Sequence, residues 1–317
     1  MYHGILNVYK EKGYTSFDVV AKLRGICGQK KIGHTGTLDP DAEGVLPVCL
    51  GRATKACDLL TDRDKAYRAV MLLGVETDTQ DMTGQILSEC PTDGITETMV
   101  RNAIRAFVGE IEQIPPMYSA LKVDGKKLCD LARAGETVER QPRKITIYKI
   151  DIETIDLPRV TMSVRCSKGT YIRTLCHDIG ETLGCHAALE RLVRTEAAGY
   201  TLENAHRLDE IQAMKDAGML ENLVRSLEDV FQDLPTLQTK WMEDRLLHNG
   251  NPLSPRMLVW KSDDRDEELR STELSRLRFR VMDSEDVFCG IYRYSDEKDC
   301  FVPVKMFLPD DGDETES

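Results

Sequence analysis

The residues best suited to chemistry lie in one segment, GHTGTLDPDAEGVLPVCLGRATK, at positions 33–55. His34, Asp39, Asp41 and Glu43 supply an imidazole and three carboxylates, the groups that most often act as acids, bases or nucleophiles. Taken alone, a glycine-rich stretch with one histidine and a few acids is usually only a loop. The Walker pattern GxxxxGK followed by Ser or Thr does not occur in it, and its acids and histidine lack a recognised metal-ligand spacing.

The elements around this segment must position those side chains. Residues 15–28 predict a helix, with Ser16 as its cap and Gly28 at its end. The following stretch, 31–55, holds four glycines and two prolines, so much of it is expected to be loop. Further along, apolar periodicity predicts a buried strand at 67–77, a helix at 96–109, two strands in ITIYKIDIETI and RVTMSVRCS, and a helix at 171–184 that Gly184 closes.

The last third of the chain has a different pattern. A long amphipathic pattern extends from Leu208 to Phe231, and Pro235 ends it. The charged run 261–270 indicates a loop, and the tail 310–317 indicates disorder. Between these two lie the segments of a three-strand meander, RLRFRVM, VFCGIYRY and CFVPVKMFL.

Composition narrows the class of protein. The chain has 317 residues, of which 41% are hydrophobic and 30% charged, enough for a sizeable core and for about two domains. It shows neither a secretory signal nor an apolar run of the ~20 residues that span a bilayer. Its ten cysteines form no CxxC pair. They therefore indicate reduced thiols and a cytoplasmic location rather than disulfides or a zinc site.

The net charge of −12 is unevenly distributed. Residues 1–200 carry 27 basic and 27 acidic side chains, whereas residues 201–317 carry 15 basic and 27 acidic ones. The acidic character of the whole chain is therefore a weak argument against nucleic-acid binding by its first 200 residues.

Taken whole, the segment at 33–55 resembles the signature of the bacterial TruB family, the tRNA pseudouridine synthases that isomerise uridine-55 in the T loop. Four other blocks resemble that family, in its order, across residues 5–195. They are LNVYKEKGYTSFDVV, DKAYRAVMLLGVETDTQDMTG, PPMYSALKVDGKKLCDLAR and CSKGTYIRTLCHDIGETLG. One departure is Glu11, which follows Lys10 where the family usually has proline.

The resemblance implies cofactor-free chemistry. Pseudouridine forms when the glycosidic bond breaks, the uracil turns, and the base is rejoined through C5, so no atoms are added and no redox change occurs. By resemblance, Asp39 is the catalytic carboxylate; whether it attacks a carbon or removes a sugar proton stays open. Either role needs its ionised form. Burial opposes ionisation and a close cation favours it. The resemblance makes Arg173 that cation, able to form two hydrogen bonds that a lysine would not reproduce.

The target uridine must leave its stack, at a cost of a few kcal/mol. Stacking of the flipped base on an aromatic side chain offsets this cost by ~1–3 kcal/mol per base. By resemblance, Tyr67 is that aromatic side chain and a candidate acceptor of the C5 proton. Tyr171 and Leu192 match positions that line the base pocket. His34, expected to be neutral, matches the residue that supports the rearranged loop after flipping.

Substrate binding must also neutralise phosphates. The resemblance adds Lys10 and Lys55 to the substrate-binding residues. Further candidates lie before residue 200. They are Lys30, Lys31, Arg52, Lys122, Lys126, Lys127, Arg140, Arg143, Lys144, Arg165 and Lys168. Binding that depends on such contacts should weaken with salt.

We therefore predict an α+β fold: a mixed, largely antiparallel sheet with flanking helices in a catalytic domain at 1–232, and a small β domain at 233–317. The resemblance implies that this second domain is PUA-like and touches the tRNA acceptor stem; a plain stabilising domain is the alternative. We expect a monomer that acts on tRNA without metal, cofactor or membrane. The rival functions are a tRNA-binding folding helper that needs no chemistry and a nucleotide-binding enzyme.

Overall fold

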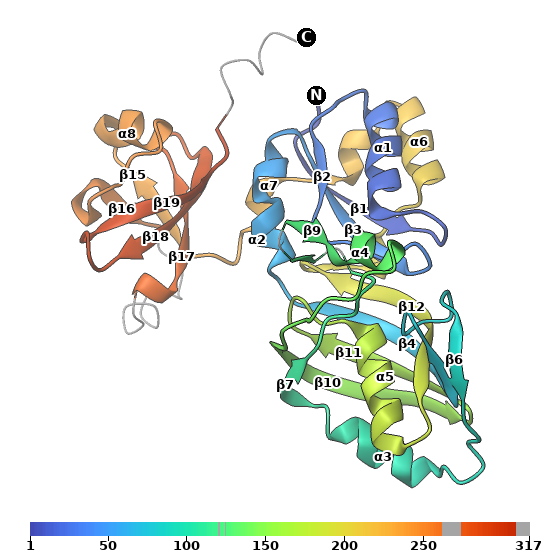
Figure 1. Ribbon diagram of the computed structural model, residues 1–317. Coiled ribbons are helices and arrows are strands. Elements are labelled where there is room, and N and C mark those ends of the chain that lie inside the picture. Colours follow the sequence, from blue (N-terminus) through green and yellow to red (C-terminus); the bar gives the residue numbers. More distant parts are fainter. Residues whose placement is uncertain (120, 124, 262–273, 309–317) are drawn as a thin grey trace.

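The computed structural model in Figure 1 describes residues 1–119, 121–123, 125–261 and 274–308. Its described residues form a ten-stranded sheet with flanking helices and, near the C-terminus, a separate five-stranded sheet. The predicted α+β fold is confirmed. The charged run expected to be a loop, apart from Lys261, and the tail 310–317 lie outside the described residues.

The ten-stranded sheet consists of two antiparallel parts joined by a short parallel step. Its strand order is β14-β1-β3-β12-β4-β11-β10-β7, with β2 beside β3 and β13 beside β12. Only β3 and β12 pair in parallel, at Glu43 with Val193 and Gly44 with Arg194. The N-terminal part comprises β1 Gly4–Lys10, β2 Ile32–His34, β3 Glu43–Leu50 and β14 Val224–Arg225. The central part comprises β4 Lys65–Leu73, β7 Gly109–Gln113, β10 Arg143–Asp156, β11 Arg159–Cys166, β12 Ala187–Ala197 and β13 Tyr200–Thr201.

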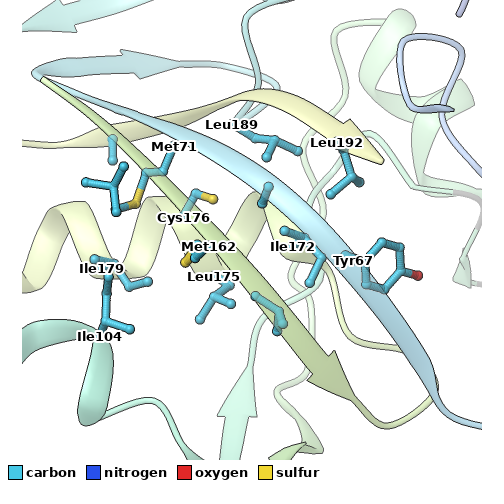
Figure 2. Close-up of a cluster of buried hydrophobic side chains, with 14 of the residues drawn as sticks. Tyr67, Met71, Ile104, Met162, Ile172, Leu175, Cys176, Ile179, Leu189 and Leu192 are labelled. Carbon is cyan, nitrogen blue, oxygen red and sulfur yellow. The ribbon is translucent and has the colours of Figure 1, made fainter. Parts of the chain in front are cut away.

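Each part has its own helices and core. Helices α1 Ser16–Cys27 and α6 Leu208–Asp216 bury Val19, Leu23 and Ile211 against β1 and β3. Helices α3 Glu97–Arg105 and α5 Ile172–Leu183 lie on the central part (Figure 1), where their apolar side chains share a core with β4, β11 and β12. Figure 2 shows this second core, which includes Met71, Met162, Leu175, Ile179 and Leu189.

The start of α1 differs from its prediction by one residue. Thr15, with extended backbone, is the cap, and its hydroxyl accepts a hydrogen bond from the Asp18 N–H at 3.0 Å. Asp18 accepts one in return from the Thr15 N–H, which completes a capping box. Ser16, predicted as the cap, is instead buried inside the first turn. The predicted ends of α1 at Gly28 and of α5 at Gly184 are confirmed, and both glycines are left-handed.

Two other predictions were wrong in extent. Much of the glycine-rich stretch is strand, because β2 and β3 leave only residues 35–42 as loop between them. Pro47 is accommodated inside β3, where its carbonyl accepts a hydrogen bond from the Thr35 N–H at 3.1 Å. The long amphipathic pattern does not form one helix. Gly218 turns left-handed after α6, and a 3-10 turn, β14 and α7 Leu227–Val230 follow.

Shorter elements connect these layers. They are η1 Gly51–Ala56, α2 Cys57–Thr61, β5 Val75–Thr77, β6 Ile86–Glu89, β8 Lys122–Val123, β9 Lys126–Lys127, α4 Leu128–Arg133, η2 Leu202–Asn204 and η3 Leu220–Leu223. No helix in the described part of the chain is both long and apolar enough to cross a membrane.

The C-terminal sheet has the order β16-β15-β17-β18-β19 and its own core around Leu237, Phe279 and Tyr292. Its elements are β15 Thr236–Thr239, η4 Trp241–Glu243, α8 Asp244–His248, η5 Pro255–Met257, β16 Leu258–Trp260, η6 Leu274–Arg276, β17 Arg278–Met282, β18 Phe288–Ser295 and β19 Cys300–Met306. The predicted meander is confirmed as β17, β18 and β19. Phe307 stacks on Phe231, which joins this sheet to the rest of the chain. The division at residue 233 stays a prediction.

Candidate active site

A cavity of about 510 Å³ opens where the two parts of the large sheet meet. This volume lies within the ~300–1,000 Å³ of small-molecule sites. The five residues predicted to do the chemistry or to line the base pocket all line it: Asp39, Tyr67, Tyr171, Arg173 and Leu192. These residues lie up to 153 positions apart in the sequence, from Asp39 to Leu192, and the fold brings all five to the same cavity.

Asp39 lies on the loop 35–42, between β2 and β3. Its carboxylate Oδ2 is 3.2 Å from Nε of Arg173, in the first turn of α5. The Arg173 side chain is 7% exposed and that of Asp39 44%, so a buried cation holds a carboxylate that faces the cavity. The other guanidinium nitrogens of Arg173 point elsewhere: Nη2 donates to the Tyr118 carbonyl at 2.8 Å and Nη1 to the Thr79 carbonyl at 3.2 Å.

Arg173 also pairs with a second carboxylate, which the sequence analysis missed. Oδ2 of Asp81 lies 3.3 Å from Nη1 of Arg173, and the Asp81 side chain is 15% exposed. The other oxygen of Asp81 accepts hydrogen bonds from the Thr79 hydroxyl at 2.8 Å and the Thr83 N–H at 3.0 Å. Asp81 lies in the sequence block TDTQDMTG, which resembles the family. Nothing in the spacing of that block indicates that Asp81 pairs with Arg173.

The charge state of Asp39 follows from these neighbours. Burial raises the pKa of Asp39 above its ordinary value of 3.8, and the Asp81 charge raises it further. Arg173 lowers the pKa of Asp39, as expected, and Lys10 lowers it less, but the two cations do not outweigh burial. Asp39 therefore ionises at a higher pH than a solvated aspartate does.

Two buried polar side chains hold the loop on either side of Asp39. The Ser16 hydroxyl accepts from the Leu38 N–H at 2.9 Å and donates to the Leu38 carbonyl at 3.3 Å. The ammonium of Lys10 donates to the carbonyls of Pro40 at 3.1 Å and Ala42 at 2.6 Å. Each of the two side chains thus replaces hydrogen bonds that a short loop cannot make to itself.

The placement of Lys10 bears on its predicted role. Its side chain is fully buried, and burial lowers the pKa of Lys10 to about 8. Its hydrogen bonds in the described chain go to the carbonyls of Glu11, Pro40 and Ala42, so Lys10 holds the loop in place. Its contact with substrate stays a prediction. Glu11, where the family usually has proline, pairs with Arg207 at the surface.

Tyr67 lies at the edge between the core and the cavity. Its ring, 8% exposed, comes from β4 and lies near Ile172 and Leu192, and its hydroxyl points away from the aliphatic cluster (Figure 2). Burial raises the pKa of Tyr67, while the neighbouring Arg194 guanidinium opposes that shift. Both interpretations of Tyr67, as a core strand residue and as a base-stacking residue, fit this placement, because the side chain belongs to the hydrophobic core and also lines the cavity.

Tyr171 is held through its backbone. The side-chain amide of Gln113, on β7, donates to the Tyr171 carbonyl at 3.0 Å and its oxygen accepts from the Tyr171 N–H at 2.8 Å. Since Tyr171 is the N-cap of α5, these bonds also set where Arg173 begins its turn.

Arg194, also missed by the sequence analysis, is the largest fully buried side chain of the described residues. It lies on β12 directly opposite Tyr67 on β4 and lines the cavity. Burial lowers the pKa of its guanidinium, and Tyr67 opposes that shift. In a sequence, an arginine within a strand usually indicates the solvent-exposed face of a sheet. Nothing in the sequence therefore marked Arg194 as buried.

The other predicted substrate-binding residues differ in whether they line the cavity. His34, Lys10 and Lys55 are not among the described residues that line the cavity. Nδ1 of His34 accepts from the Gly36 N–H at 3.3 Å, and burial lowers the pKa of His34, which favours the neutral ring that the sequence predicts. Of the candidate phosphate contacts, Arg143, Lys144 and Lys168 line the cavity. The side chains of Lys122 and Lys127 lie outside what the structure describes.

Comparison with known proteins decides the family. Residues 24–172 match the model "TruB family pseudouridylate synthase (N terminal domain)", and residues 173–232 match "tRNA pseudouridylate synthase B C-terminal domain". Together they cover more than half of the chain. The chain belongs to the TruB family.

Curated relatives agree with this TruB assignment. The chain is 50% identical over 314 residues to "tRNA pseudouridine synthase B" of Lachnoclostridium phytofermentans, which covers 96% of this chain and 100% of the relative. It is 40% identical over 306 residues to the protein of that name from Clostridium tetani, with 96% and 100% coverage. The family predicted from the sequence is thereby confirmed, and the chain is an enzyme, a tRNA pseudouridine synthase of the isomerase class.

Solved structures share the TruB-type fold. "Crystal Structure of a Cbf5-Nop10-Gar1 Complex" contains a chain 25% identical to this one, with a TM-score of 0.73 and coverage of 97% of this chain and 85% of that chain. "Structure of H/ACA RNP bound to a substrate RNA containing 2'-deoxyuridine" contains another at 23% identity and a TM-score of 0.72, covering 98% and 86%. At this identity the second likeness shows the fold alone.

Proposed function

We propose that this enzyme isomerises uridine-55 in the T loop of tRNA, with Asp39 as the catalytic carboxylate. One observation carries the proposal: the Asp39–Arg173 ion pair and the Tyr67 ring line the same cavity, which is large enough for a nucleotide. A folding helper that only bound tRNA would have no use for a carboxylate paired to a buried cation inside such a cavity.

The cavity suits a flipped pyrimidine nucleotide. Tyr67 offers a ring on which a base stacks, and Leu192 and Ile172 extend the apolar surface beside it. The Asp39 carboxylate then meets the nucleotide from the loop side, with Arg173 holding its orientation. Attack on carbon and removal of a sugar proton both start from ionised Asp39, so both need a pH above its raised pKa.

The RNA backbone would follow the cations at the cavity. Arg143, Lys144 and Lys168 are among its lining residues and are suited to the phosphates of the T arm. The C-terminal sheet, as a PUA-like domain, would extend the contact to the acceptor stem. A monomeric state and a cytoplasmic location stay predictions from the sequence.

Tritium release tests the proposal. Unmodified tRNA labelled at uracil C5 is incubated with wild type, with Asp39→Asn, and with a matched transcript that has cytidine at position 55. Wild type should release about one label per tRNA and leave the label of the altered transcript in place. Asp39→Asn should release none while binding tRNA as wild type does.

Three outcomes would contradict the proposal. Normal turnover by Asp39→Asn would remove Asp39 as catalyst. Equal release from the cytidine-55 transcript would move the target elsewhere in the tRNA. Binding by wild type without any release would favour the folding helper.

A further inference from the structure

Arg194 lies where the two parts of the large sheet pair, among the residues that the structure describes. It lies at the parallel step, opposite Gly44 on β3. A Cβ on Gly44 would be 2.3 Å from the Arg194 carbonyl oxygen, and Gly44 has φ +105°, so the two backbones approach as closely as only glycine allows. On its other side Arg194 faces Tyr67 of β4.

The guanidinium of Arg194 reaches back to the catalytic loop. Its Nε donates to the Val45 carbonyl at 2.7 Å, at the start of β3. Its two terminal nitrogens approach the Gly36 carbonyl at 3.3 Å and the Thr37 carbonyl at 3.5 Å. Gly36 and Thr37 belong to the loop that carries Asp39.

A buried cation normally has a carboxylate partner. Arg194 is 1% exposed, yet no ion pair among the described residues joins it to a carboxylate. Its charge is solvated by loop and strand carbonyls and by the neighbouring Tyr67. The planar guanidinium group of arginine can donate hydrogen bonds to several carbonyls at once, which a lysine ammonium cannot do in the same geometry.

We propose that Arg194 is a positioning residue that joins the Asp39 loop to the Tyr67 ring, so that both face the same nucleotide. This inference rests on the proposed function only in that Asp39 and Tyr67 act on one uridine. The competing role is structural, in which Arg194 merely stabilises the sheet where its two parts meet.

Two substitutions separate these roles. Arg194→Lys keeps the positive charge but loses the planar guanidinium group. Arg194→Gln loses the charge. Arg63→Lys is the control, because Arg63 is partly buried, donates like Arg194 to a backbone carbonyl, that of Val230, and is not among the residues that line the cavity. Each variant is compared with wild type in melting temperature, in tRNA affinity, and in the single-turnover rate of tritium release.

We expect Arg194→Lys to fold and to bind tRNA within a few-fold of wild type, while its single-turnover rate falls by about 100-fold, as for a small misplacement of reacting groups. Arg63→Lys should leave rate and affinity unchanged. A normal rate in Arg194→Lys would overturn the proposal. Loss of folding in both Arg194 variants would assign the residue to stability and would also overturn it.

A second measurement does not depend on activity. With 3-fluorotyrosine at position 67, the ¹⁹F signal reports the phenol ring in the full chain. Arg194→Gln should move the titration midpoint of that ring to higher pH, because the guanidinium charge favours the ionised phenol. An unmoved signal would show that Arg194 and Tyr67 are not in contact, which would overturn the proposal whatever the result of the tritium assay. Absence of label release from uridine-55 by wild type would count against the proposed function alone.

Discussion

The two parts of the ten-stranded sheet contribute to the site in different ways. The N-terminal part supplies Asp39 from the loop 35–42, where no ladder of hydrogen bonds holds the backbone. The central part supplies Tyr67 from the middle of a sheet and Arg173 from the first turn of a helix. The proposed catalytic carboxylate is therefore held by a loop, and its partners by regular structure.

This difference explains where the buried polar side chains lie. Ser16, Lys10 and Arg194 each make at least one hydrogen bond to a carbonyl or amide of the Asp39 loop. In the central part, Arg173 is held by the Asp39 and Asp81 carboxylates and by the Tyr118 carbonyl, on a helix whose N-cap is bonded to Gln113. A residue on a loop depends on such bonds to fix its backbone, whereas the backbone of a residue inside a helix or strand is already fixed by regular hydrogen bonds.

The largest effect should come from the central part. Arg173→Lys loses the nitrogen geometry that reaches Asp39, Asp81 and two carbonyls together, so turnover should fall by about 100-fold. Tritium release measures it. Arg68→Lys is the control, because Arg68 pairs with Glu153 at the surface. A lysine variant within twofold of wild type would show that the guanidinium geometry does not matter.

The next effect concerns the loop. Ser16→Ala leaves the buried Leu38 N–H without its acceptor, which should cost about 1–3 kcal/mol of unfolding free energy and lower turnover by about tenfold through displacement of Asp39. Thr15→Ala is a well-matched control. It removes the cap of the same helix, at about 1 kcal/mol, without touching the loop. Equal turnover in the two variants would contradict a positioning role for Ser16.

A smaller effect should appear in the pH profile. Asp81 raises the pKa of Asp39, so Asp81→Asn should lower that pKa while Asn still offers Arg173 an oxygen. The acid limb of the single-turnover rate, which follows ionisation of Asp39, should therefore move to lower pH. An acid limb that stays in place or moves to higher pH would show that Asp81 does not act on Asp39.

The smallest effect is on stability. Because the folded-state pKa of Asp39 is raised, the folded chain binds the proton more tightly than the unfolded chain, and stability falls as pH rises through the interval between the two pKa values. Asp39→Asn mimics the protonated form. It should raise the melting temperature slightly at neutral pH and leave it unchanged at a pH below both values. A lower melting temperature at neutral pH would contradict a raised pKa.

Much of the architecture could be predicted from sequence, because it depends on local rules. Apolar periodicity located α1, α5, β10 and β11, and the left-handed glycines at 28 and 184 ended their helices as expected. The capping residue of α1 was missed by one position, since Thr15 and Ser16 are equally good caps by residue type. The tertiary contact of Ser16 with Leu38 separates their roles.

The sequence by itself determined the family, through ordered blocks of residues that the comparisons confirm, and with the family the enzyme class. Only the tertiary structure decided that Arg173 bridges two carboxylates, that Lys10 holds a loop, and that Arg194 is buried between Asp39's loop and Tyr67. The physical reason is that these contacts join residues about 30 to 160 positions apart, as from Lys10 to Pro40 or from Arg194 to Gly36. No local period encodes the environment of a charge, which depends on which strands become neighbours.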